Sequence, residues 1–238
     1  MTTRRIMIVN PNTSAAMTAS VVAAARGVAA AGTEIVGGTS SRGVASIESH
    51  VDEVWGSLGV LEQVRLGEND RVDAYVIACF GDTGVPAARE LARGPVVGMT
   101  EAALFTGAVI AHRFAIVTMP RRTMEQSDRV VRAVGLEHRC IVRAVEVPVS
   151  DVEHGSGHLL DVFAVEGRMA IEQDGAEAII LGCAGLTDLV RPLQDALGVP
   201  VIDGVLAAVT MAEGLLAQGL TTSRASTFAA PERLGPDA

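Results

Sequence analysis

Two cysteines occupy matching positions in the two halves of this chain. Residues 73–84 read DAYVIACFGDTG, and residues 176–188 read AEAIILGCAGLTD. In each segment an apolar run ends in a cysteine, Cys79 or Cys183, and a glycine follows within two residues. Two thiols on opposite sides of one carbon atom suit inversion of a stereocentre, because one thiolate removes a proton and the opposite thiol returns a proton to the other face.

A lone cysteine after a strand more often packs as a small apolar residue than does chemistry. The pairing favours chemistry here, since a helix is expected to begin directly after each cysteine. The helix dipole and the free N–H groups of a first turn lower the pKa of a nearby thiol. The glycines allow close approach of a substrate and leave backbone N–H groups free for a developing oxyanion.

Four polar residues are further candidates for contact with a substrate. Asn10, in the motif NPNTS, follows the first apolar run, and Thr118 follows the corresponding run of the second half. Such residues either line a cleft or only turn the chain and cap a helix. Asp82 and Thr83 lie in the first cysteine turn. We expect Asp82 either to orient a substrate N–H group or to cap the helix that follows it.

The remaining cysteine and the histidines carry weaker signals. Cys140 has no partner in the other half and is interpreted as a packed or surface residue without a catalytic role. His154 and His158 are four residues apart, as in a helical metal pair, but the glycines around them break a helix. The three cysteines, spaced 61 and 43 residues apart, match neither a disulfide framework nor a zinc pattern. We therefore expect no metal and a reducing, cytoplasmic environment.

Short runs of Val and Ile alternate with longer segments of helical period, which indicates an α/β protein with parallel sheets. The clearest helix follows NPNTS, where Asn12, Thr13 or Ser14 is expected to cap its first turn. Eight strands are predicted, at residues 6–10, 34–37, 74–79, 96–98, 114–118, 142–147, 178–183 and 201–203.

The two halves repeat one another. RIMIVNPNTS corresponds to RFAIVTMPRRT, VIACFGDTG to ILGCAGLTD, and GPVVGMTEAA to VPVIDGVLAA. The two cysteines are 104 residues apart, and the prolines of the last pair are 105 residues apart. Such constant offsets indicate an internal duplication. We therefore expect two pseudo-symmetric α/β lobes, each a four-stranded parallel sheet flanked by helices. Ligands of parallel sheets bind beyond the carboxyl ends of the strands, which predicts an active site in the cleft between the lobes.

Composition excludes several classes of function. The 238 residues carry a formal net charge of -9, and every one of the 19 basic residues is an arginine. An acidic chain with scattered arginines lacks the basic patch that nucleic acids or anionic membranes require. The absence of lysine excludes a Schiff base and hence pyridoxal phosphate. No run approaches the roughly 18 apolar residues of a membrane span.

The motifs NPNTS, ACFGD and LGCAG resemble those of the aspartate/glutamate/hydantoin racemase superfamily. Within it the chain is similar to the hydantoin racemases, which include allantoin racemases, almost from end to end. The resemblance implies catalysis by Cys79 and Cys183 without a cofactor or metal, and a homo-oligomer. It also implies that the C-terminal helix packs back on the first lobe, so that residues 1–98 plus 205–238 form one lobe and residues 99–204 form the other.

Departures from related families indicate the substrate. Amino-acid racemases of the superfamily carry Asn-Thr after the first cysteine and Thr after the second, where they handle a charged carboxylate and ammonium. This chain has smaller or apolar residues there, which suits a small neutral ring such as hydantoin or allantoin. The expected substrate-binding residues around the two cysteines are accordingly Phe80, Gly81, Asp82, Thr83, Gly182, Ala184 and Gly185, together with Asn10 and Thr118.

Two alternatives remain at this stage. One is another cysteine-dependent enzyme of the same superfamily: a decarboxylase, a maleate-type isomerase or an amino-acid racemase. The other is a non-catalytic protein that binds a small molecule between two lobes. The substituent at C5 of the ring, ureido, alkyl or aryl, also stays open.

Overall fold

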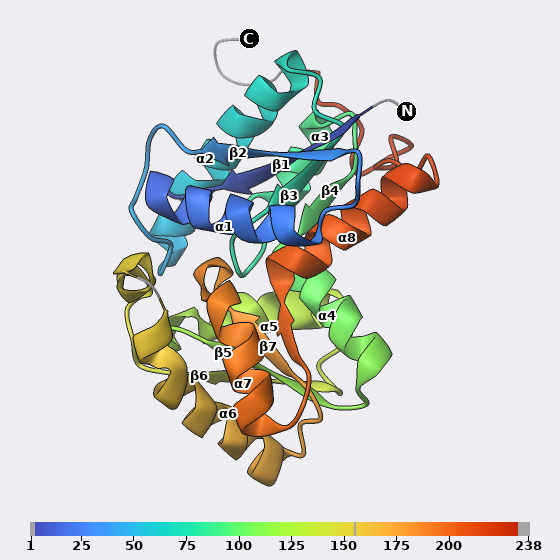
Figure 1. Cartoon of the computed structure of the whole chain (residues 1–238). Helices are drawn as coiled ribbons and strands as arrows, with labels where there is room; N and C mark the ends of the chain where they lie inside the picture. Colours follow the sequence, from blue (N-terminus) through green and yellow to red (C-terminus); the bar gives the residue numbers. More distant parts are fainter. Residues whose placement is uncertain (1–2, 155, 233–238) are drawn as a thin grey trace.

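The computed structural model describes residues 3–154 and 156–232 and contains two parallel sheets, one in each half of the chain (Figure 1). The strands are β1 (Arg4–Asn10), β2 (Thr33–Thr39), β3 (Ala74–Ile77), β4 (Val96–Gly98), β5 (Phe114–Thr118), β6 (Cys140–Ala144), β7 (Ile179–Gly182) and β8 (Val201–Asp203).

Helices fill most of the connections between these strands. The α-helices are α1 (Ala15–Val28), α2 (His50–Asn69), α3 (Val85–Leu91), α4 (Met99–Ile110), α5 (Met124–Ala133), α6 (Leu160–Asp174), α7 (Val190–Leu197) and α8 (Gly204–Ala217). Short 3₁₀ helices are η1 (Arg121–Thr123), η2 (Val149–His154), η3 (Gly157–Leu159) and η4 (Ala184–Leu189). No helix in the described part of the chain is both long enough and apolar enough to cross a membrane.

The two sheets have the same topology. Their strand orders are β2-β1-β3-β4 and β6-β5-β7-β8, and every neighbouring pair is parallel. The sequence-based prediction of two four-stranded parallel sheets flanked by helices is therefore confirmed. All carboxyl ends of one sheet lie at one edge, so the segments that follow β1, β3, β5 and β7 are placed to build a site.

Both faces of the first sheet are covered, as alternate residues of β1 demonstrate. Ile6 and Ile8 belong to one buried cluster, whereas Met7 and Val9 belong to another on the opposite face. Burial on both faces explains why the strands read as continuous apolar runs rather than as alternating patterns.

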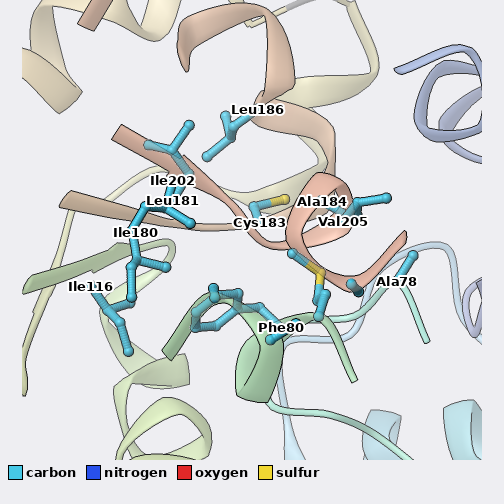
Figure 2. Close-up of a cluster of buried hydrophobic side chains, with 14 of the residues drawn as sticks. Ala78, Phe80, Ile116, Ile180, Leu181, Cys183, Ala184, Leu186, Ile202 and Val205 are labelled. Atoms are coloured by element: carbon cyan, nitrogen blue, oxygen red, sulfur yellow. The ribbon is translucent and has the colours of Figure 1, made fainter. Parts of the chain in front are cut away.

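The larger cluster continues from one half of the molecule into the other. It includes Phe80, which follows β3, together with Ile116 of β5 and Ile180 of β7 (Figure 2). The segment after β3 is thus packed against the core of the second half.

Two helices pack beside the sheet that they do not follow. The helix α4 begins directly after β4 of the first sheet but contacts β7 and β8 of the second. The helix α8 begins directly after β8 but contacts α1, β3 and β4 (Figure 1). The chain therefore crosses between the halves at Gly98–Met99 and again at Asp203–Gly204. These crossings agree with the proposed lobes of residues 1–98 plus 205–238 and 99–204, whose division stays a prediction.

One strand is displaced from its predicted position. We expected it at residues 142–147, but β6 runs from Cys140 to Ala144. Its pairing partner β5 ends at Thr118, which lies opposite Ala144, so the residues beyond have no strand to pair with. Cys140 opens this strand and is buried, so it is a packed residue rather than a surface residue.

Candidate active site

A pocket between the two halves is lined by both Cys79 and Cys183. About 470 Å³ between its lining atoms is empty, which includes space open to solvent. The lining residues are Asn10, Pro11, Asn12, Met17, Ile47, Ala78, Cys79, Phe80, Thr118, Met119, Thr123, Gln126, Ser127, Val149, Gly182, Cys183 and Ala184. None of these residues carries a charged side chain other than the ionisable thiols.

Asn10 holds the loop that follows β1. Its Nδ2 donates to Asn12 Oδ1 at 2.8 Å and to Thr18 Oγ1 at 3.0 Å, and its Oδ1 accepts the N–H of Asn12 at 3.2 Å. Ser14 caps α1 by accepting the N–H of Met17. Asn10 therefore lines the pocket and also fixes the turn after β1. The sequence had offered these two roles as alternatives.

Thr118 and Gly182 mark the corresponding strand ends in the second sheet. They pair across β5 and β7, and Thr118 Oγ1 lies 3.2 Å from the carbonyl oxygen of Gly182. A Cβ atom on residue 182 would lie 2.6 Å from the Cα atom of Thr118. Glycine is required here because the two strands approach too closely for any side chain.

The two cysteines have equivalent positions but different hydrogen-bond partners. The sulfur of Cys79 lies 3.4 Å from Thr83 Oγ1. For Cys183, the backbone N–H groups of Gly185 and Ala184 instead lower the pKa of the thiol. Thr187, which corresponds to Thr83, donates its hydroxyl to Asp203.

Burial governs the ionisation of both thiols. It raises the pKa of Cys79 to about 12, against the lowering effect of the Thr83 hydroxyl, and the nearby Cys183 raises it further. It raises the pKa of Cys183 to about 11, against the lowering effect of the N–H groups of Gly185 and Ala184. The expectation of a lowered thiol pKa is therefore wrong. Loss of water outweighs the N–H groups, because desolvation penalises the thiolate directly.

Asp82 acts on a different helix from the one expected. Its two carboxylate oxygens accept the N–H groups of Thr100 at 2.8 Å and Glu101 at 2.9 Å, at the start of α4. The cap of the following helix α3 is Gly84, which makes no side-chain cap bond. Burial and the neighbouring Glu101 raise the pKa of Asp82 to about 7. Asp82 thus ties the turn after Cys79 to the first crossing between the halves.

Asp203 likewise accepts backbone N–H groups of a crossing helix, α8, at the second crossing between the halves. It accepts the N–H groups of Val205 at 2.7 Å and Leu206 at 3.0 Å, at the start of α8. Val205 and Leu206 lie 105 residues after Thr100 and Glu101, the offset of the duplication. Each half therefore caps the crossing helix with a carboxylate, but from the cysteine turn in one case and from the strand end in the other. Burial raises the pKa of Asp203 also.

Some expected substrate-binding residues do not line the pocket. Gly81, Asp82 and Thr83 face a second cavity bounded by α2, α3 and α5. The N–H group of Gly81, a candidate oxyanion donor, donates to Thr100 Oγ1 at 2.8 Å. Gly185 is not among the lining residues either.

Several lining residues were not expected from the sequence. Gln126 and Ser127 lie in the first turn of α5, the helix that follows β5 as α1 follows β1, so the duplication was a signal that could have found them. Ile47 lies in a loop and Val149 begins η2, and neither belongs to a motif. They meet at the pocket only because the two halves pack together, which no local pattern encodes.

Comparison with known proteins places these features in a family context. The family model described as Asp/Glu/Hydantoin racemase matches residues 6–212. A hydantoin racemase of Rhizobium meliloti is 44% identical over 95% of this chain and 94% of its own length. A hydantoin racemase of Pseudomonas sp. (strain NS671) is 40% identical over 96% and 92% respectively. The solved structure of an allantoin racemase from Klebsiella pneumoniae is 44% identical and superposes with a TM-score of 0.93, covering 98% of this chain and 99% of the other.

Proposed function

Because the chain belongs to the Asp/Glu/hydantoin racemase family, we propose that it is a racemase that inverts C5 of 5-monosubstituted hydantoins, allantoin included, without a cofactor. The observation that carries this proposal is the pair of cysteines at equivalent strand ends of a duplicated fold, both lining one uncharged pocket. Its hydantoin racemase relatives extend over nearly the whole chain.

The chemistry requires one thiolate and one thiol. The thiolate removes the C5 proton, which the adjacent ring carbonyl acidifies, and electron density moves to the carbonyl oxygen. The opposite thiol then donates its proton to the other face of C5, which inverts the centre and leaves the second sulfur as the thiolate. The reverse reaction exchanges the roles of Cys79 and Cys183.

The absence of charged side chains in the pocket supports a neutral substrate. An amino acid or a dicarboxylate carries charges that need cationic or multiple hydroxyl partners. A hydantoin ring needs only amide-type donors and acceptors. Phe80 and Ala184, which follow the two cysteines, offer no such partner, and this favours a hydantoin over the substrates of an amino-acid racemase, a maleate-type isomerase or a decarboxylase.

Polarimetry on optically pure substrates tests this proposal. Wild-type protein is expected to abolish the optical rotation of (S)- and (R)-allantoin, or of both enantiomers of 5-benzylhydantoin, and Cys79→Ser and Cys183→Ser are expected to leave it unchanged. If the wild type changes neither substrate but binds hydantoin, a non-catalytic binding protein becomes the better account.

We further propose that the protein is a homo-oligomer. Val51, Val54, Trp55 and Leu58 recur at helical spacing along α2, and all four side chains are exposed. Such an apolar stripe fits an interface between copies of the chain. Light scattering should give a molecular mass that is a whole multiple of 24.6 kDa. Leu58→Glu should reduce this mass, whereas Val165→Glu on α6 should leave it unchanged.

A cytoplasmic location is part of the same proposal. Mixed thiol and thiolate chemistry needs Cys79 and Cys183 reduced, and all three cysteines are free. Reduced thiols persist in the cytoplasm rather than in oxidising compartments.

A further inference from the structure

Two polar side chains from α5 enter the pocket. Gln126 and Ser127 lie in the first turn of this helix and are only 4% and 1% exposed. Both line the pocket that contains the two cysteines. Nothing in the proposed proton transfer uses either of them.

The other polar side chains of the pocket are already engaged. Asn10 and Asn12 bond to each other and to the loop after β1, and Thr118 and Thr123 bond to backbone carbonyl oxygens. Within the part of the chain that the structure describes, neither the Gln126 amide nor the Ser127 hydroxyl has a hydrogen-bond partner. Their polar atoms are not sealed from solvent, so both groups reach the open space of the pocket, where a bound molecule can pair with them.

Gln126 also lies beside the reacting centre. A Cβ atom on Gly81 would lie 3.1 Å from the Cβ atom and 3.8 Å from Oε1 of Gln126. Gly81 is two residues from Cys79, so the amide reaches the pocket next to the turn that carries one catalytic thiol. A group bound there is part of, or attached to, the ring whose C5 atom lies between the sulfurs.

We propose that Gln126 and Ser127 bind a urea group of the substrate. A urea offers N–H donors beside a carbonyl acceptor, and a glutamine amide and a serine hydroxyl each provide both a donor and an acceptor. This inference rests on the proposed racemase activity. Two parts of a substrate have this chemistry: the N1–C2–N3 edge of every hydantoin ring, and the ureido arm that only allantoin carries at C5.

Kinetics of Gln126→Leu and Ser127→Ala show which of these two parts of the substrate is bound. Loss of one hydrogen bond should raise KM roughly three- to tenfold, with a smaller change in kcat. If the ring edge is bound, the increase appears with both allantoin and 5-isopropylhydantoin. If the ureido arm is bound, it appears with allantoin alone. Values within twofold of wild type for both variants and both substrates would overturn the proposal.

Controls separate recognition from folding. Gln173→Leu makes the same change on the exposed face of α6 and should leave KM unaltered. Gln126→Asn keeps an amide and should recover part of the affinity, which a purely structural role does not predict. If Gln126→Leu fails to fold, Ser127→Ala carries the kinetic test alone.

A binding measurement is independent of turnover. Calorimetry with wild-type protein and both variants should use unsubstituted hydantoin, which has the ring urea but no stereocentre, and allantoin. A wild type that binds but does not racemise would refute the proposed function and leave this inference standing. Equal dissociation constants in wild type and variants, for both compounds, would refute the inference alone.

Discussion

At the scale of single residues, the two sulfur atoms are equivalent in position but not in environment. The hydroxyl of Thr83 lies next to Cys79 and lowers its pKa, whereas backbone N–H groups of Gly185 and Ala184 have this effect on Cys183. In both cases burial outweighs these groups and raises the thiol pKa. We therefore expect both thiols to be neutral at pH 7 and the reactive form with one thiolate to be a minor species.

This predicts an alkaline pH profile. The reactive form requires one cysteine ionised, so its population grows as pH rises toward the lower pKa, about 11. It declines only when the second thiol, with a pKa of about 12, also ionises. We expect kcat/KM to increase about tenfold per pH unit from pH 7 to 9. A plateau across this range would mean that a thiolate is already formed at neutral pH.

Thr83→Val tests how far the Thr83 hydroxyl opposes the effect of burial on the pKa of Cys79. The Thr83 hydroxyl lowers the pKa of Cys79, so removal of this hydroxyl should raise that pKa and move the ionisation of Cys79 to higher pH. Absorbance of the thiolate near 240 nm reports the ionisation directly. Thr210→Val, on the exposed surface of α8, is the control and should leave the titration unchanged.

The sequence predicted which residues could react but not how they ionise. The cysteines were identifiable because the duplication places both after an apolar strand. Their raised pKa values were not, because desolvation depends on what packs around Cys79 and Cys183 in the folded molecule. The local signal, a glycine-rich helix start, indicated lowered thiol pKa values instead.

At the scale of elements, two carboxylates hold the helices that cross between the halves. Asp82 reaches α4 from the cysteine turn, and Asp203 reaches α8 from the end of β8. Gly98 corresponds to Asp203, and its missing side chain leaves room for Asp82: a Cβ atom there would lie 2.3 Å from the Cγ atom of Asp82. The same contact is thus made from two different positions in the chain.

This geometry predicts mutual rescue between Asp82→Gly and Gly98→Asp. The first change removes the cap of α4, and the second alone collides with Asp82. Together they place a carboxylate where Asp203 stands in the other half, since Gly98 (φ -78°, ψ 142°) and Asp203 (φ -94°, ψ 126°) have similar backbone angles. Each single variant should lose about 1 kcal/mol or more of stability. The double variant should be more stable and more active than either.

Thermal unfolding and kcat measure this coupling. Losses that simply add in the double variant would show that the two carboxylates are not interchangeable. Sequence reasoning expected Asp82 to cap the helix after it, because local capping is the common pattern. The actual partner lies 18 residues ahead in the chain and could be found only from the fold.

At the scale of the whole molecule, segments from both halves meet beside the pocket. Glu48 Oε1 accepts the hydroxyl of Ser46 at 2.9 Å and the N–H of Val149 at 3.1 Å, which joins a loop of the first half to η2 of the second. Ile47 and Val149, on either side of this contact, both line the pocket. The contact therefore joins the two halves beside the pocket.

Glu48→Ala should remove this contact between the halves. We expect KM to rise roughly fivefold, as for one lost hydrogen bond to a charged group, with kcat less affected. Glu48→Gln keeps an acceptor and should stay near wild type. Glu62→Ala is a matched control, because Glu62 accepts from Ser41 within the first half only. If Glu62→Ala raises KM as much as Glu48→Ala, the bond between the halves is not what supports substrate binding.

The overall architecture was predictable because a duplication repeats its signals. Eight strands in two parallel sheets and the equivalent positions of both cysteines follow from periodicity and a constant offset, whereas the strand order was not predicted and β6 is displaced from its predicted position. The contributions of Ile47, Val149, Gln126 and Ser127 were not predicted. They arise from packing between segments far apart in the sequence, where no spacing rule applies.

Deuterium incorporation with single cysteine variants tests the central claim most directly. In deuterated buffer, wild-type enzyme should convert either hydantoin enantiomer into a product that carries deuterium at C5. Unreacted substrate should keep its hydrogen early in the reaction, because the acid and the base are different sulfur atoms. Cys79→Ser and Cys183→Ser should each abolish racemisation of both enantiomers. If either variant racemises at close to the wild-type rate, the two-thiol mechanism is wrong.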